Sequence, residues 1–185
     1  MTHAVSVFRL TTFLLAGLLA GCDPGSPVDA DAPSVHDLAG RGDTGRLLAT
    51  IAGAGDVDHR DVCYRTPLML AAQSGHLQTV TELIAAGARV DLHEKGYYTA
   101  LMLAAGNGHS DVVRALAAAG AAVDEVEITR GWTALIWAAK RGHTETVRLL
   151  LTLGADPGRQ DRQGRSARDW ALAQGHDDVV ALLRR

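Results

Sequence analysis

A dipeptide that recurs at a nearly constant interval is the feature that most constrains the fold of this chain. Glycine followed by histidine occurs at 75–76, 108–109, 142–143 and 175–176, so the intervals are 33, 34 and 33 residues. The same register reaches back to Gly42 and Asp43, where the copy is degenerate. A period of this length indicates a solenoid, in which each unit packs only against its neighbours. We therefore expect about five stacked units over residues 34–185.

Each central unit carries the signals of two helices. Thr66, Thr99 and Thr133 precede apolar runs and can cap a first helix, which should end near the glycine of the Gly-His pair. A second helix should follow at once and end at another glycine, at 87, 120 and 154, before a polar hairpin loop. Its apolar residues recur at spacings of three and four and form one stripe, made of Val80, Leu83, Ile84, Val112, Val113, Leu116, Val147, Leu150 and Leu151.

Composition narrows the classes of function. The chain is 47% hydrophobic and 21% charged, which is typical of a folded protein, but only 4% aromatic, which argues against a large aromatic-lined cofactor pocket. A net charge of −3 provides no global basic field for a nucleic-acid duplex. Two cysteines exclude a disulfide framework and a four-cysteine zinc site within one chain.

The order of residues within a unit resembles the ankyrin repeat. Residues 66–72 read TPLMLAA and are followed by Gly75-His76, an apolar segment and Gly87-Ala88, close to the family pattern T-P-L-H-x-A-A-x-x-G-H. The resemblance recurs in phase over about 150 of the 185 residues. It implies an all-α ankyrin-repeat solenoid of about five helix-turn-helix repeats joined by short β-hairpin loops.

The chain departs from the family pattern in two respects. The histidine of T-P-L-H is replaced by a residue that we expect to contact the core in the first three copies; the replacements are Met69, Met102, Ile136 and Asp169. The hairpin glycine is present as Gly131 and Gly164, but tyrosine stands at 64 and 97, which predicts a distorted loop there. The segment 125–130 also carries one extra residue, and the last copy has the charged end of a capping repeat.

The N-terminal segment resembles the export signal of a bacterial lipoprotein. Arg9 precedes the apolar stretch 10–20, which is too short to span a bilayer, and Leu19-Ala20-Gly21-Cys22 resembles a lipobox. The resemblance implies a signal peptide over 1–21, lipidation of Cys22, a flexible tether over 22–33 and an ankyrin-repeat domain over 34–185. The alternative is an ordinary cleaved signal with an incidental cysteine.

These features predict a location in the bacterial cell envelope. The lipid anchor would face the periplasm and provide the only membrane contact, and Asp23 resembles a signal for retention in the inner membrane. Cys63 would then be a lone, accessible thiol in a hairpin loop, either a redox handle or a residue without a role.

No constellation for catalysis is evident. His76, His109, His143 and His176 occupy equivalent places in stacked units, and helices about 8–10 Å apart keep such side chains from sharing one metal ion. We expect a structural role for them near the start of each second helix. There is neither a nucleophile elbow nor a phosphate-binding glycine loop. We therefore predict no enzyme activity, no cofactor and no metal site.

The resemblance implies that a partner meets the concave face, which hairpin tips and the end of each first helix form. The predicted protein-binding residues are aromatic or basic, without an acid among them, and they are Arg65, Lys95, Tyr98, Arg130, Trp132, Lys140, Arg141, Arg162 and Arg165. Arginine and aromatic residues dominate interface energies. We expect a monomer that binds an acidic protein partner and no nucleic acid.

The predicted function is therefore a membrane-tethered protein–protein interaction module in the cell envelope. Two alternatives stay open: an inhibitor or immunity protein, and an accessory protective factor for a periplasmic enzyme such as a catalase. A resident enzyme that co-purifies with its activity intact would favour the second, and a toxic partner whose activity falls on mixing would favour the first.

Overall fold

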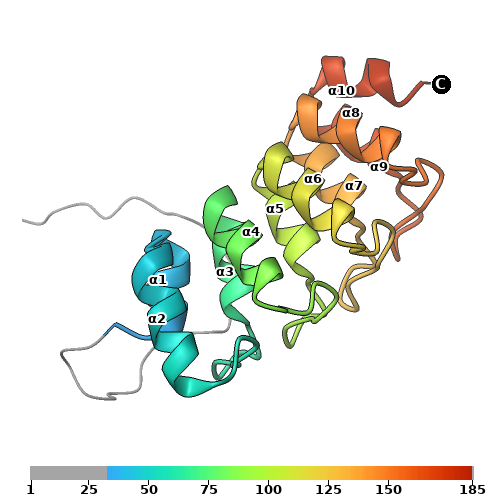
Figure 1. Ribbon diagram of the computed structural model, residues 1–185. Helices are drawn as coiled ribbons and strands as arrows, with labels where there is room; N and C mark the ends of the chain where they lie inside the picture. The colour runs from blue at the N-terminus through green and yellow to red at the C-terminus, as the bar shows by residue number, and fades with distance from the viewer. Residues whose placement is uncertain (1–32, 185) are drawn as a thin grey trace, which may run out of the picture.

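The computed structural model describes residues 33–184 and shows a curved stack of helical pairs over that range (Figure 1). The predictions for the signal peptide, for Cys22 and for residues 22–32 of the tether fall outside the described residues. The ten helices of the described part are α1 (Val35–Arg41), α2 (Thr44–Ala54), α3 (Pro67–Ser74), α4 (Leu77–Ala85), α5 (Ala100–Gly106), α6 (Ser110–Ala118), α7 (Ala134–Lys140), α8 (Thr144–Thr152), α9 (Ala167–Gln174) and α10 (Asp177–Leu182).

The helices form two layers. The first helices of the units, α1, α3, α5, α7 and α9, pack on one another in chain order, and the second helices α2, α4, α6, α8 and α10 form the other layer. Loops project from one edge of the stack between successive pairs (Figure 1). The β-bridges of the described loops are isolated and antiparallel, His93 with Thr99 and Gln160 with Ser166, and single backbone hydrogen bonds join Asp61 to Arg65 and Glu127 to Trp132 in the other two loops. The fold is the expected all-α solenoid of five helix-turn-helix units.

Capping fixes where each first helix begins and ends. The hydroxyls of Thr66, Thr99 and Thr133 each accept a hydrogen bond at 3.3 Å from the backbone N–H three residues later, as predicted. Pro67 occupies the first turn of α3, where its missing N–H costs nothing. The chain leaves α3 through Gly75, whose φ of 77° is a left-handed value that suits glycine.

Small side chains make the contact between neighbouring first helices. The alanine pairs at 71–72, 104–105 and 138–139 are all fully buried. The apolar stripe of the second helices closes the core from the other side through Val80, Leu83 and their equivalents. Met69, Met102 and Ile136 are at most 2% exposed, so core contact does replace the family's histidine there. Asp169 instead accepts hydrogen bonds from the Ser166 backbone N–H (2.9 Å) and hydroxyl (2.7 Å).

The four histidines of the Gly-His pairs link each unit to the one before it. Nε2 lies 3.0–3.2 Å from a backbone carbonyl oxygen of the preceding first helix: Gly40 for His76, Gln73 for His109, Gly106 for His143 and Lys140 for His176. Each ring also covers the glycine of the preceding pair so closely that a Cβ at Gly75 would lie 2.5 Å from Nδ1 of His109. The predicted structural role is therefore confirmed.

Two expectations about the first hairpin loops are wrong. Tyr64 and Tyr97 do not distort their loops, because they adopt φ values of 64° and 65°, close to the 77° and 74° of Gly131 and Gly164. Cys63 is not accessible but 2% exposed, and it is not left as a lone thiol. Among the described residues, no helix is long and apolar enough to cross a membrane.

Candidate protein-binding groove

A groove of about 570 Å³ lies between the third and fourth hairpin loops and the helices that follow them. We call it the C-terminal groove and define it by its lining residues, which are Thr129, Arg130, Trp132, Trp137, Lys140, Arg141, Asp161, Arg162, Gln163, Arg165 and Trp170. Six of the predicted protein-binding residues belong to this set: Arg130, Trp132, Lys140, Arg141, Arg162 and Arg165. The structure thus brings together the C-terminal part of the predicted surface.

The floor of the C-terminal groove contains all three tryptophans of the chain. Trp132 precedes α7, Trp137 lies on α7 and Trp170 lies on α9. The Trp132 ring meets Trp137 edge to face at a centroid distance of 4.9 Å and Trp170 at 5.1 Å. Such edge-to-face contacts add stability beyond the buried area. Trp132 is only 5% exposed, so it supports the groove more than it offers a surface.

Basic side chains lie over the faces of these rings. Arg130 stands 4.8 Å from the Trp132 centroid and Arg165 3.7 Å from that of Trp170. Lys140 reaches both rings, at 5.4 Å and 5.2 Å, and Arg141 covers Trp137 at 5.1 Å. Attraction to the negative ring face holds a cation in place without neutralising it. The groove therefore presents positive charge at fixed positions.

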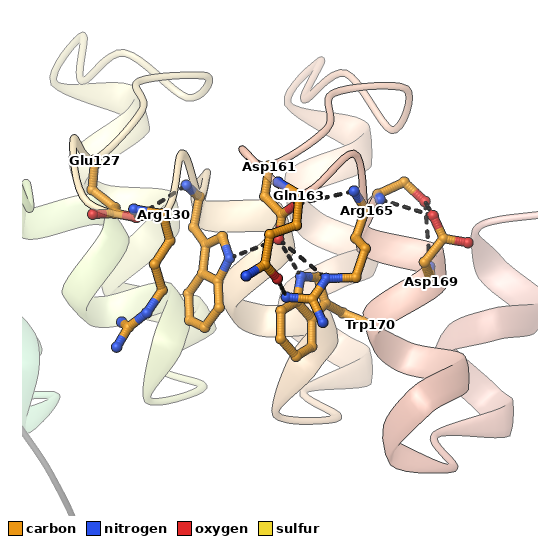
Figure 2. Close-up of polar contacts among 9 residues, drawn as sticks. Glu127, Arg130, Asp161, Gln163, Arg165, Asp169 and Trp170 are labelled. Carbon is orange, nitrogen blue, oxygen red and sulfur yellow. Dashed lines mark hydrogen bonds and ion pairs between the residues drawn. The ribbon is translucent and has the colours of Figure 1, made fainter.

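The Asp161 carboxylate connects two of the groove tryptophans to the fourth hairpin loop. Its Oδ2 accepts hydrogen bonds from the indole N–H groups of Trp132 (3.1 Å) and Trp170 (2.9 Å), and its Oδ1 accepts from the backbone N–H of Gln163 (2.8 Å) and Arg165 (3.0 Å), as Figure 2 shows in part. Arg165 Nε lies 3.6 Å from the same carboxylate. Burial opposes ionisation of Asp161, but hydrogen bonds led by that from the Arg165 backbone hold its pKa below the usual value.

The Glu127 carboxylate also binds backbone N–H groups, in the preceding hairpin loop. It is fully buried, and its carboxylate accepts hydrogen bonds from the backbone N–H groups of Thr129 (2.7 Å), Arg130 (2.6 Å) and Trp132 (3.2 Å). Burial of Glu127 raises its pKa, but the hydrogen bonds from the Thr129 hydroxyl and from the three backbone N–H groups lower it by more. The pKa of Glu127 therefore lies below its usual value. The carboxylate thereby sets the loop that carries Arg130 over the groove.

Asp161 and Glu127 were not among the residues predicted from the sequence to form the site. Acidic residues stand at the start of every hairpin loop, at 61, 94, 127 and 161, with intervals of 33, 33 and 34 residues. That period matches the Gly-His period and could have identified them as structural. The predicted surface contained only hairpin tips and the ends of the first helices and was therefore free of acids, whereas Asp161, at the start of its loop, is part of the groove lining.

Two buried polar atoms of the groove have no hydrogen-bond partner in the described part of the chain: the Trp137 indole nitrogen, and Arg165 Nε, which lies 3.6 Å from the Asp161 carboxylate. The Trp137 indole nitrogen is buried and has no hydrogen-bond acceptor, unlike those of Trp132 and Trp170. A buried donor without an acceptor costs about 1–3 kcal/mol. The groove is thus built on two satisfied indoles and one unsatisfied indole.

The other three predicted protein-binding residues lie outside the groove lining. Arg65 is held by Asp61, with Nε 2.8 Å from Oδ2. Lys95 lies 5.5 Å from the ring centroid of Tyr64. Tyr98 packs edge to face on Trp137 at 5.7 Å and so adjoins the groove from the second loop. The predicted surface is therefore split between a basic groove and a more N-terminal row of loops.

Within residues 33–184 there is no group of histidine, cysteine or acidic side chains that could hold a metal ion. Comparison with curated proteins gives no match. The sequence does match the family model described as Ankyrin repeats (3 copies), over residues 35–127 and 122–185. Since these two ranges cover most of the chain, and the fold has the paired helices and projecting loops described above, the chain belongs to the ankyrin-repeat family.

Proposed function

We propose that this chain is a monomeric binding module that holds an acidic protein partner in the C-terminal groove. Ankyrin repeats are protein–protein interaction modules and are typically non-enzymatic. The observation that supports the acidic partner is the charge of the groove lining. The lining contains five basic side chains, Arg130, Lys140, Arg141, Arg162 and Arg165, but only one carboxylate, that of Asp161, which already receives four hydrogen bonds.

The arrangement of side chains in the C-terminal groove favours a role in binding over a role in keeping the protein soluble. Cations held against indole rings lose little side-chain entropy when a partner arrives, so more of the interaction energy remains as affinity. Arginine and tryptophan are also the residues that most often dominate the energy of protein interfaces. Carboxylates of the partner would bind guanidinium groups that are already oriented for paired hydrogen bonds.

The test begins with capture of the partner by the full chain under mild crosslinking, followed by a measurement of Kd with the purified partner. The double variant Arg130→Ala/Arg162→Ala removes two exposed groove charges and leaves all three tryptophans in the sequence, although it removes the contact of Arg130 with the Trp132 ring. We expect Kd to rise by about tenfold and the wild-type Kd to rise with salt, because charge–charge attraction is screened.

A matched variant controls for the loss of two positive charges. Arg114→Ala/Arg148→Ala removes exposed arginines from α6 and α8. This control should leave Kd unchanged. Equal effects of the two double variants, or a Kd that does not respond to salt, would contradict the proposal. Assay of the partner's own activity in the same mixtures would show whether binding activates, protects or inhibits it.

We also propose that Cys22 carries a lipid that tethers the module to the periplasmic side of the bacterial inner membrane. Support comes from the lipobox-like residues 19–22 and from Asp23. A diacylated or triacylated cysteine anchors stably, whereas one chain would not. Mass spectrometry of the N-terminal peptide should find the lipid on wild type, and Cys22→Ser should release the protein from membranes. An N-terminal peptide without lipid, or a Cys22→Ser variant that stays with the membranes, would contradict this proposal.

A further inference from the structure

Two tyrosines occupy a backbone conformation that suits glycine. Tyr64 and Tyr97 have φ values of 64° and 65°, and they are the only residues other than glycine with positive φ in the described part of the chain. The equivalent positions of the later loops hold Gly131 and Gly164 at 77° and 74°. A side chain in the left-handed region is strained, and such strain persists where the surrounding structure or a function retains it.

The contacts that the Tyr64 and Tyr97 side chains make within the chain do little to offset this strain. Tyr64 is 50% exposed, and its ring centroid lies 5.6 Å from the Arg60 guanidinium and 5.5 Å from the Lys95 ammonium. Tyr97 is 44% exposed, and its ring stacks on that of His93 at 4.0 Å. Contacts between exposed rings and cations are weak because water competes for both. The folded chain alone therefore gives no strong reason to have tyrosine rather than glycine.

The two rings belong to a row of exposed apolar side chains on the loop tips. Val62 is 66% exposed and Ile128 is 45% exposed, at equivalent places in the first and third loops. The fourth loop has Arg162 and Gln163 at its tip instead. We call Val62, Tyr64, Tyr97 and Ile128 the tip row. Its apolar character ends where the basic groove begins.

The tip row and the C-terminal groove adjoin one another. Tyr98, which follows Tyr97, packs on Trp137 at the groove. Neighbouring loops are also joined along the edge of the stack, by hydrogen bonds from Lys95 N–H to the Cys63 carbonyl (3.2 Å) and from Arg162 N–H to the Arg130 carbonyl (2.8 Å). A single extended segment of a partner can therefore contact both.

We propose that Tyr64 and Tyr97 are a second contact for the acidic partner, and that the partner segment carries apolar or aromatic side chains beside its carboxylates. This inference rests on the proposed function. Charge complementarity sets the occupant, because Arg60 and Lys95 flank the Tyr64 ring and the groove beyond is basic. The apolar side chains of the segment lie on the tip row, and its acidic part lies in the groove.

The test uses a phage-displayed library of random linear peptides, selected on the full chain. Wild type should enrich peptides with acidic residues at one end and leucine, phenylalanine or tyrosine at the other. Tyr64→Gly/Tyr97→Gly should retain the acidic enrichment, lose the apolar one and bind the wild-type peptides about tenfold more weakly. Its urea midpoint should equal or exceed that of wild type, because the strain is relieved.

Three further variants separate this inference from a structural role of the rings. Tyr64→Phe/Tyr97→Phe keeps both rings and should retain the apolar enrichment. Leu172→Ala removes an exposed apolar side chain of α9 outside the tip row and should leave selection unchanged. Arg130→Ala/Arg162→Ala should lose the acidic enrichment.

The outcomes distinguish the two proposals. Acid-only peptides from wild type, or a glycine variant that unfolds more easily and selects the same peptides, would overturn the inference about the tyrosines and leave the groove intact. Apolar enrichment without acids would overturn the proposed function. Peptides with neither feature would overturn both.

Discussion

At the scale of single residues, the glycine of a Gly-His pair lies against the histidine ring of the next unit and leaves no space for a side chain. A Cβ at Gly75 would lie 2.5 Å from Nδ1 of His109, and φ there is 77°. Gly75→Ala should therefore lower the free energy of unfolding by about 2 kcal/mol or more, from strain and displacement of the ring. Urea denaturation measures this effect.

The control for this substitution is Gly53→Ala in α2, where a Cβ meets nothing within 4 Å and φ is not positive. It should raise the free energy of unfolding by about 0.5–1 kcal/mol, since alanine favours a helix more than glycine does. Similar losses for both variants would show that the His109 contact is not the cause.

A second pair of substitutions probes the indole N–H groups. Trp132→Phe leaves Asp161 without one of its donors and should lower the free energy of unfolding by about 1–3 kcal/mol beyond the loss of ring area. Trp137→Phe removes a buried donor that has no acceptor, so this extra penalty should be absent. Thermal denaturation compares the two, and a larger loss for Trp137→Phe would contradict the hydrogen-bond assignment.

Some of these residue roles could be predicted from the sequence and others could not. The capping threonines and the Gly-His pairs were predictable because both recur in phase and act within their own unit or on the next. The role of Asp161 was harder, because its partners Trp132 and Trp170 stand 29 and 9 residues away. Residue type alone suggested that Trp132 would be a surface anchor, whereas packing buries it.

At the scale of the elements, carboxylates rather than glycines hold the hairpin loops. In the first loop the Tyr64 N–H donates to the Asp61 carbonyl at 2.9 Å, while the Asp61 side chain accepts from the backbone of Cys63 and Arg65 at 2.8 Å. This network imposes the left-handed conformation at residue 64 whatever its side chain. The expectation of a distorted loop failed because it considered the missing glycine and not the carboxylate that recurs in every loop.

These loop carboxylates predict acid sensitivity. The pKa values of Glu127 and Asp161 lie below their usual 4.5 and 3.8 in the folded chain, so the unfolded chain binds protons first as pH falls. Their stabilisation is complete above those usual values and is lost as pH falls through the lower, folded values. Urea midpoints measured between neutral pH and about pH 3 should fall most steeply below about pH 4.5.

Asp161→Asn provides the control, since asparagine does not titrate. This variant should start from lower stability and lose less of it on acidification than wild type does. Identical pH profiles would show that another group dominates.

At the scale of the whole molecule, His143, in the middle of the stack, gives a second pH dependence. Burial lowers the pKa of His143 from its usual 6.5, and nearby Arg141, His109 and His176 add to the effect against a hydrogen bond to Gly106. As pH falls, His143 therefore binds a proton at a higher pH in the unfolded chain than in the folded chain. The contribution of neutral His143 to stability should be complete above about pH 6.5 and should decrease below it until pH reaches the lower pKa of the folded chain.

Measurement of urea midpoints at about pH 7.5 and pH 5.5 tests this expectation. His143→Gln should start lower, since the ring covers Gly108, and should show a smaller difference between the two pH values. A difference as large as that of wild type would assign the dependence to other groups.

The placement of the tryptophans gives the molecule an asymmetric optical reporter. All three lie on or just before α7 and α9, so tryptophan fluorescence, excited where tyrosine does not absorb, monitors the C-terminal end of the stack, while circular dichroism monitors every helix. In a stack whose units contact only their neighbours, the two ends can melt separately. Unfolding curves from the two signals that coincide would mean that the five units behave as one cooperative body, and curves that diverge would show which end opens first.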